Sequence, residues 1–178
     1  MRKVLLIITC LMATLFISCK KVDAYTKFNL EFNQSVTIPS STGLNLPFNI
    51  LTPDVKTNSE AEFEINDTRK DLIELIQITK LTMTHQSPSN GNFKFLKSIQ
   101  IYLTAEGLSE IKVAWNENVS EDIDKTLELE TTENDLQEYI KKDKFGLRVQ
   151  TVTDEAFNSD QEIAIQSVFF VDAKILGQ

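Results

Sequence analysis

The chain has 178 residues, with 18 basic and 26 acidic side chains and a net charge of −8. This acidic excess argues against a nucleic-acid partner, because binding to phosphates needs clustered lysine and arginine. Two cysteines and one histidine are too few for cysteine-rich zinc sites, iron–sulfur clusters or multi-histidine metal centres.

The first eighteen residues have the layout of a cleavable secretory signal peptide. Two basic residues precede an apolar run over residues 4–16, and the small Ser18 stands directly before Cys19. A transmembrane helix is the weaker interpretation, because a bilayer span needs about 20 apolar residues and this run is shorter.

The residues that lead up to Cys19 resemble the lipobox of bacterial lipoproteins, in the looser form of Bacteroidetes. They read Leu15, Phe16, Ile17, Ser18 and Cys19, with Phe16 where the family favours leucine. The resemblance implies that Cys19 carries a diacylglyceryl thioether and that cleavage occurs before it. Lys20 implies, by the same resemblance, an outer-membrane destination, with the leaflet left open.

Two alternatives to this N-terminal interpretation remain. Cleavage at Cys10 would strand the apolar residues 11–17 on the mature protein, so Cys10 is better explained as part of the signal helix. An ordinary signal peptide would leave Cys19 as an unpaired thiol. The favoured organisation is a signal peptide over 1–18, a lipidated tether over 19–25 and a single domain over 26–178, whose length suits one full core.

Alternation of apolar and polar residues dominates from residue 26 onward and predicts β-strands. The first strand covers residues 26–38. Residues 60–65 alternate acidic and apolar side chains, which predicts a second strand with an acidic outer face. Asn66 or Asp67 is then expected to cap a short helix over residues 72–76.

A hairpin is predicted in the middle of the chain, after a turn at residues 87–91. Its first strand has apolar residues of one parity over 93–103, and its second strand covers 111–115. Trp115 shares parity with the other apolar residues of the second strand, which predicts a place in the core. Tyr102 has the opposite parity and is expected to face outward.

The remaining chain continues the β pattern. A short strand at 127–129 precedes an amphipathic helix over 136–140, a strand over 145–149, an acidic loop over 154–161 and a last strand over 163–175. The expected fold is mainly β, an antiparallel β-sandwich of immunoglobulin-like type with one or two short helices.

Candidate reactive residues are few. His85 has no Gly-x-Ser-x-Gly motif to accompany it, so we expect a partly buried residue at a strand end. Paired carboxylates could act in a glycosidase if two faced each other, and Asp122 with Asp124 could hold calcium, although the EF-hand spacing is missing. The acidic candidates are Glu121, Asp122, Asp124, Glu128, Glu130, Asp154, Glu155 and Asp160.

No catalytic residue, metal ligand or cofactor is predicted, and the ligand-binding residues are not identified. The sequence favours a non-catalytic binding or structural module of the cell envelope, attached to the membrane through the lipid on Cys19. Its expected partner is a glycan or another envelope protein. Two alternatives stay open: an envelope hydrolase that uses loop carboxylates, and a carrier of an apolar ligand within the sandwich.

Overall fold

The computed structural model describes residues 27–40 and 43–174, and in these residues the chain is mainly β. The predicted signal peptide, Cys10, Cys19 and the tether lie outside the described residues. The strands are β1 (Lys27–Ile38), β2 (Pro47–Leu51), β3 (Val55–Lys56), β4 (Ile73–Ser87), β5 (Leu96–Thr104), β6 (Ile111–Asn116), β7 (Thr126–Thr131), β8 (Lys144–Thr153) and β9 (Gln161–Ala173). The helical segments are α3 (Ser59–Ile65), a 3-10 turn at Lys70–Leu72, and α4 (Gln137–Ile140).

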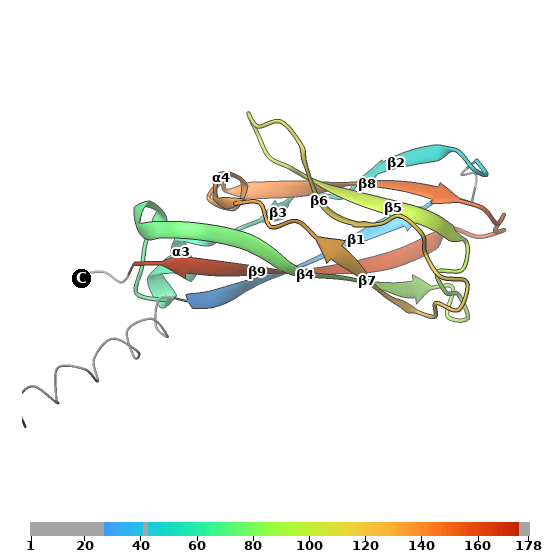
Figure 1. Cartoon of the computed structure of the whole chain (residues 1–178), viewed down its shortest axis with the longest axis horizontal. Helices are drawn as coiled ribbons and strands as arrows, with labels where there is room; N and C mark the ends of the chain where they lie inside the picture. The colour runs from blue at the N-terminus through green and yellow to red at the C-terminus, as the bar shows by residue number, and fades with distance from the viewer. Residues whose placement is uncertain (1–26, 41–42, 175–178) are drawn as a thin grey trace, which may run out of the picture.

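The strands form one curled antiparallel sheet in the order β1-β9-β4-β7-β6-β5-β8-β2, and β3 also pairs with β8. Figure 1 shows how the curl produces two layers, with β1, β9, β4 and β7 below and β6, β5, β8 and β2 above. The β6–β7 pairing joins the layers. This order is that of a jelly roll, in which the first strand pairs with the last. The mainly β, antiparallel prediction is confirmed, but the immunoglobulin-like type is wrong.

The core lies between the two layers. Phe145 of β8 packs edge to face against Phe32 of β1 and Phe169 of β9, with ring centres 5.0 and 6.0 Å apart. These contacts join strands from opposite layers, so the curled sheet closes over an aromatic interior. Burying such rings supplies much of the driving force for the fold.

The strand alternation is confirmed where one face of a strand is buried. In β1, Leu30, Phe32, Val36 and Ile38 point into the core, and their neighbours point to solvent or are partly exposed. The β5–β6 hairpin is also confirmed, and Gly107 in its loop has a φ of 76° that favours glycine. The helix expected over 136–140 is present as the single turn α4.

Residues 59–76 depart from the prediction, because helix and strand are exchanged there. Ser59–Ile65 is the helix α3, and the segment expected to be helical contains the start of β4 at Ile73. Phe63 is fully buried but Ile65 is 75% exposed, so the apolar alternation does not mark one buried face. Alanine and glutamate, which make up most of this segment, are strong helix formers.

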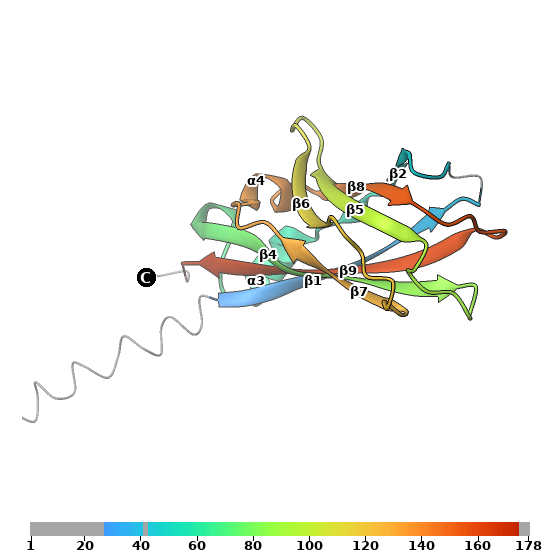
Figure 2. The same cartoon turned by 45° about the vertical axis from the view of Figure 1, so that its right-hand side comes forward.

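The first strand begins and the last strand ends at the same end of the molecule (Figures 1 and 2). Lys27 pairs with Asp172 across β1 and β9, with 3.7 Å between the ammonium nitrogen and a carboxylate oxygen. Helix α3 lies at this end too, since the rings of Phe28 and Phe63 are in contact at 6.3 Å. Among the residues that the structure describes, no helix has the length and apolar character needed to cross a membrane.

Candidate functional site

A row of outward side chains runs across the β2-β8-β5-β6 layer and continues onto β7. The strand register places one member opposite the next on five successive strands. We call these residues the cross-strand row: Asn49, Gln150, Gln100, Trp115 and Glu130. None of them is a buried residue, so the row is a surface feature of the sheet.

Trp115 belongs to this row because β6 contains one extra residue. The register with β5 shifts at Val113, which is left as a β-bulge. Val113 and Ala114 are both fully buried, so the alternation reverses after them and turns the indole outward. The prediction of a core position for Trp115 is therefore wrong. Its indole N–H donates a hydrogen bond to a carboxylate oxygen of Glu130 at 2.9 Å.

Arg148 and Tyr102 lie beside the row and are paired across β8 and β5. The guanidinium carbon of Arg148 lies 3.9 Å from the centre of the Tyr102 ring. The same guanidinium donates two hydrogen bonds to Glu110, at 2.6 and 2.7 Å, and one to the Asn49 side-chain oxygen at 2.5 Å. The outward position predicted for Tyr102 is confirmed.

The Arg148–Glu110 pair keeps both groups charged. The hydrogen bond from Arg148 lowers the pKa of the Glu110 carboxyl, against a smaller opposing effect of burial. The same hydrogen bond raises the pKa of Arg148. A bidentate guanidinium–carboxylate pair also fixes direction, so Arg148 holds its place over the tyrosine ring.

The amides of the row are held by further hydrogen bonds. The Tyr102 hydroxyl donates to the Gln100 oxygen at 2.7 Å, and the Gln100 nitrogen donates to Glu117 at 3.1 and 3.2 Å. The Gln150 nitrogen donates to the Asn49 oxygen at 3.2 Å. These bonds orient three amide groups in advance of any ligand.

Lys112 lies over the indole ring of Trp115. Its ammonium nitrogen lies 4.8 Å from the Trp115 ring centre and 3.8 Å from a carboxylate oxygen of Glu117. With Arg148 it contributes two positive charges, against three negative charges from Glu110, Glu117 and Glu130. The surface around the row is therefore close to neutral, at −1.

This arrangement offers several groups that could bind a polar ligand. Amide, carboxylate and guanidinium groups offer planar sets of hydrogen-bond donors and acceptors, which can meet adjacent hydroxyl groups of a ligand. The indole and phenol rings add contact area at a low cost in conformational entropy. Of these residues, the sequence singles out Tyr102 as outward and Glu130 as an acidic candidate.

His85 lies where the sequence placed it, at the end of β4, and its side chain is buried. Its Nε2 shares a hydrogen bond with the Gln161 side-chain oxygen at 2.8 Å. The rings of Phe93 and Phe95 pack edge to face against the imidazole. The predicted position near a strand end is confirmed, but His85 is buried and not partly buried as expected.

The acidic candidates are exposed. Glu121, Asp122 and Asp124 lie in the connection between β6 and β7, and Asp154, Glu155 and Asp160 lie between β8 and β9. Glu128 pairs with Lys80 at 3.4 Å, while Glu130 is the carboxylate that holds Trp115. In the part of the chain that the structure describes, no three metal-ligating side chains gather into a site.

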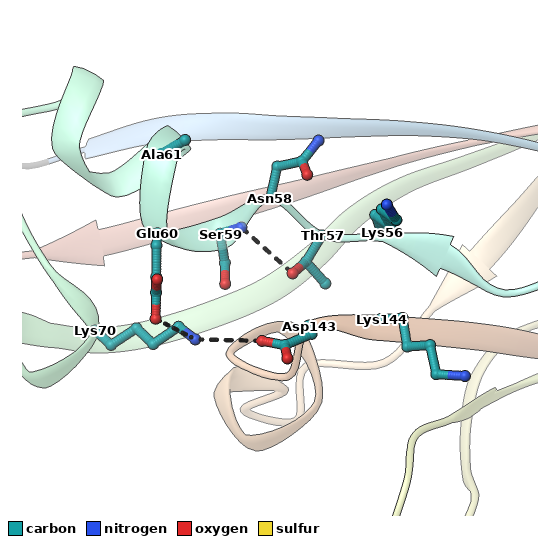
Figure 3. A pocket seen from close by; sticks show the side chains of 9 residues that line it. All are labelled: Lys56, Thr57, Asn58, Ser59, Glu60, Ala61, Lys70, Asp143 and Lys144. Atoms are coloured by element: carbon teal, nitrogen blue, oxygen red, sulfur yellow. Dashed lines mark hydrogen bonds and ion pairs between the residues drawn. The ribbon is translucent and has the colours of Figure 1, made fainter.

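A pocket of about 400 Å³ opens beside α3, at the end where β1 begins (Figure 3). Figure 3 shows the Lys70 ammonium between Glu60 and Asp143, at 3.1 and 3.9 Å. Lys144, also on its rim, is paired with Asp54 at 2.8 Å. Most of its charged groups thus bind one another, and no aromatic ring lines it. The cross-strand row is the better candidate site.

No family model and no curated protein matches this chain. One similar solved structure is described as "Structural basis for the promiscuous specificity of the carbohydrate-binding modules from the beta-sandwich super family". It is 12% identical with a TM-score of 0.31, and the match covers 88% of this chain and 58% of that one.

Two viral structures are also similar. That of turnip yellow mosaic virus is 7% identical, with a TM-score of 0.26 over 85% of this chain and 98% of that one. That of Desmodium yellow mottle tymovirus is 10% identical, with a TM-score of 0.22 over 85% of each chain. Likenesses this distant carry no argument about function.

Proposed function

We propose that this protein is a non-catalytic glycan-binding module, held at the cell envelope by a lipid on Cys19, with the cross-strand row as its binding surface. The observation that carries the proposal is the row itself. It aligns three amides, an indole and a carboxylate on five neighbouring strands, all outside the core. Hydroxyl groups of a sugar match these donors and acceptors, and its C–H faces match the indole.

The charge around the row favours an uncharged glycan. Arg148 is committed to Glu110 and Asn49, and Lys112 lies within 3.8 Å of Glu117. The charged side chains around the row sum to −1, and the whole chain has a net charge of −8. An acidic polysaccharide would therefore meet no excess of cations.

The anchor would set the orientation of this surface. Eight residues separate the start of Cys19 from Lys27, and an extended chain of that length reaches at most about 29 Å. A lipid on Cys19 would therefore keep the end that carries β1 and α3 near the membrane. The strands run along the long axis of the molecule (Figure 1). The layer that carries the row would then stand upright on the membrane, and the row itself would run parallel to the membrane surface.

A glycan array probed with the full chain tests the proposal. We expect binding to neutral glycans and a loss of at least about tenfold in affinity for Trp115→Ala and Gln100→Ala. Gln166→Ala is the matched control, because Gln166 is exposed on β9 in the other layer and should bind as the unmodified protein does.

Two results would count against it. Absence of binding to any neutral glycan, or binding that Trp115→Ala leaves unchanged, would remove the row as a glycan site. Trp, Tyr and Arg are also the residue types that dominate protein interfaces. A purified envelope protein that binds the full chain, but not Trp115→Ala, would identify the row as a protein interface instead.

A further inference from the structure

The cross-strand row has a definite length and direction. Its five members follow one another across β2, β8, β5, β6 and β7, one residue on each strand. Neighbouring strands lie 4.7–4.9 Å apart, so the four intervals from Asn49 to Glu130 span about 19 Å. The row therefore runs at right angles to the strands.

Both ends of the row are set by the sheet. Asn49 lies on β2, which ends the strand order. At the other end, β4 pairs with β7 from Thr126 to Leu129, and this pairing stops before Glu130. The register thus adds no sixth member to the row on β4.

One flank of the row is held in place by hydrogen bonds. Arg148 lies over Tyr102 and is bound in two places to Glu110, so its guanidinium is fixed beside the middle of the row. On the other flank the register brings together Pro47, Val152 and Ser98, which have short side chains. Near Trp115 a ligand would also meet the exposed Lys112–Glu117 ion pair, which it would have to displace or bind.

We infer that the ligand is an extended, neutral oligosaccharide of about four sugars, lying across the strands with one sugar for each interval between them. This inference rests on the proposed function of the row. A pyranose ring in an extended β-linked chain advances by nearly one interstrand distance, so successive sugars meet successive members. The indole of Trp115 lies in the second half of this path, next to the amide of Gln100.

Calorimetric titration of the full chain with cello-, xylo- and mannooligosaccharides of two to six sugars tests the inference. For the series that binds, affinity should rise by about tenfold or more from the dimer to the tetramer, and by no more than about twofold from the tetramer to the hexamer. Asn49→Ala should remove most of the gain between dimer and tetramer.

Glu128→Gln is the matched control, since Glu128 is exposed on β7 two residues from Glu130 but outside the row. If the dimer already binds as tightly as the tetramer, the four-sugar inference is overturned. The proposed function stands in that case, provided that Trp115→Ala still weakens binding by about tenfold or more. Affinity that continues to rise to the hexamer would also overturn the four-sugar inference. No binding by any series, together with a negative glycan array, would overturn both.

Discussion

Arg148 stacks on Tyr102, with the guanidinium carbon 3.9 Å from the ring centre, while it holds the Glu110 carboxylate through two hydrogen bonds. A third bond reaches Asn49, so one side chain ties β2, β8 and β5 together on the outer face. Only arginine can do all three, because its planar group stacks and pairs at once. This contact fixes the position of Arg148 beside the cross-strand row.

Glu110→Gln should make the free energy of unfolding less dependent on pH in the acidic range. Because Arg148 lowers the pKa of Glu110 in the folded protein, the ionised carboxylate stabilises the fold above the ordinary carboxyl pKa of about 4.3. This contribution is lost as the pH falls through the lowered value. The unmodified protein should therefore be the more stable at neutral pH, and the two should converge once the pH lies below the lowered pKa of Glu110.

Urea denaturation between about pH 3 and pH 7 measures this difference. Glu106→Gln, in the same β5–β6 connection and exposed, is the control and should track the unmodified protein throughout. A stability difference for Glu110→Gln that stays constant down to about pH 3 would show that the pairing with Arg148 is not its cause.

Gly91→Ala should destabilise the protein through His85. A methyl group at Gly91 would overlap the imidazole ring, so His85 would have to move and lose its bond to Gln161. We expect a loss of about 1–3 kcal/mol in the free energy of unfolding, measured by urea denaturation. Gly43→Ala is the control, because its added methyl would lie 3.6 Å from Leu46, an ordinary contact. Equal stabilities for the two variants would contradict this account.

Phe145→Ala should remove the ring that joins the two layers. Phe145 is 1% exposed and contacts both Phe32 and Phe169. The cavity left behind should lower the free energy of unfolding by about 3–5 kcal/mol. Phe170→Ala, at a half-buried position on the outer side of β9, should cost about 1 kcal/mol. Thermal denaturation compares them, and similar losses would mean that the interlayer contact is not central to the fold.

Cys19→Ser tests the proposed anchor. Removing the thiol should abolish labelling with a fatty-acid analogue and should release the protein from the membrane fraction or leave it as an uncleaved precursor. Cys10→Ala should be labelled and retained as before, because Cys10 is assigned to the signal helix. Unchanged membrane retention of Cys19→Ser would reject lipidation at this residue.

Strands with one buried face could be predicted from the sequence. In β1, and in β8 from Leu147 onward, the alternation is regular because each strand lies between the core and solvent. The same alternation gave a wrong prediction at Ser59–Ile65, where a strand was expected. Acidic and apolar residues alternate there in a helix that buries Phe63 and exposes Ile65. Over six residues, alternation alone does not separate a strand from a short helix, and the helix propensity of alanine and glutamate was the better guide.

The cross-strand row could not be predicted, for two physical reasons. It joins residues as distant as Asn49 and Gln150, and only the pairing of β2 with β8 brings them together. It also depends on the bulge at Val113, which reverses the parity of Trp115. Local alternation contains no information on either, so the sequence identified Tyr102 as outward and Glu130 as an acidic candidate but could not bring them together with Trp115 and the amides.

The fluorescence of Trp115 tests the central claim most directly, because it is the single tryptophan of the chain and lies within the row. Titration of the full chain with the glycan that binds best on the array should shift or quench the indole emission, with a midpoint equal to the calorimetric dissociation constant. Binding by calorimetry without any change in the emission would place the glycan elsewhere and contradict the assignment of the cross-strand row.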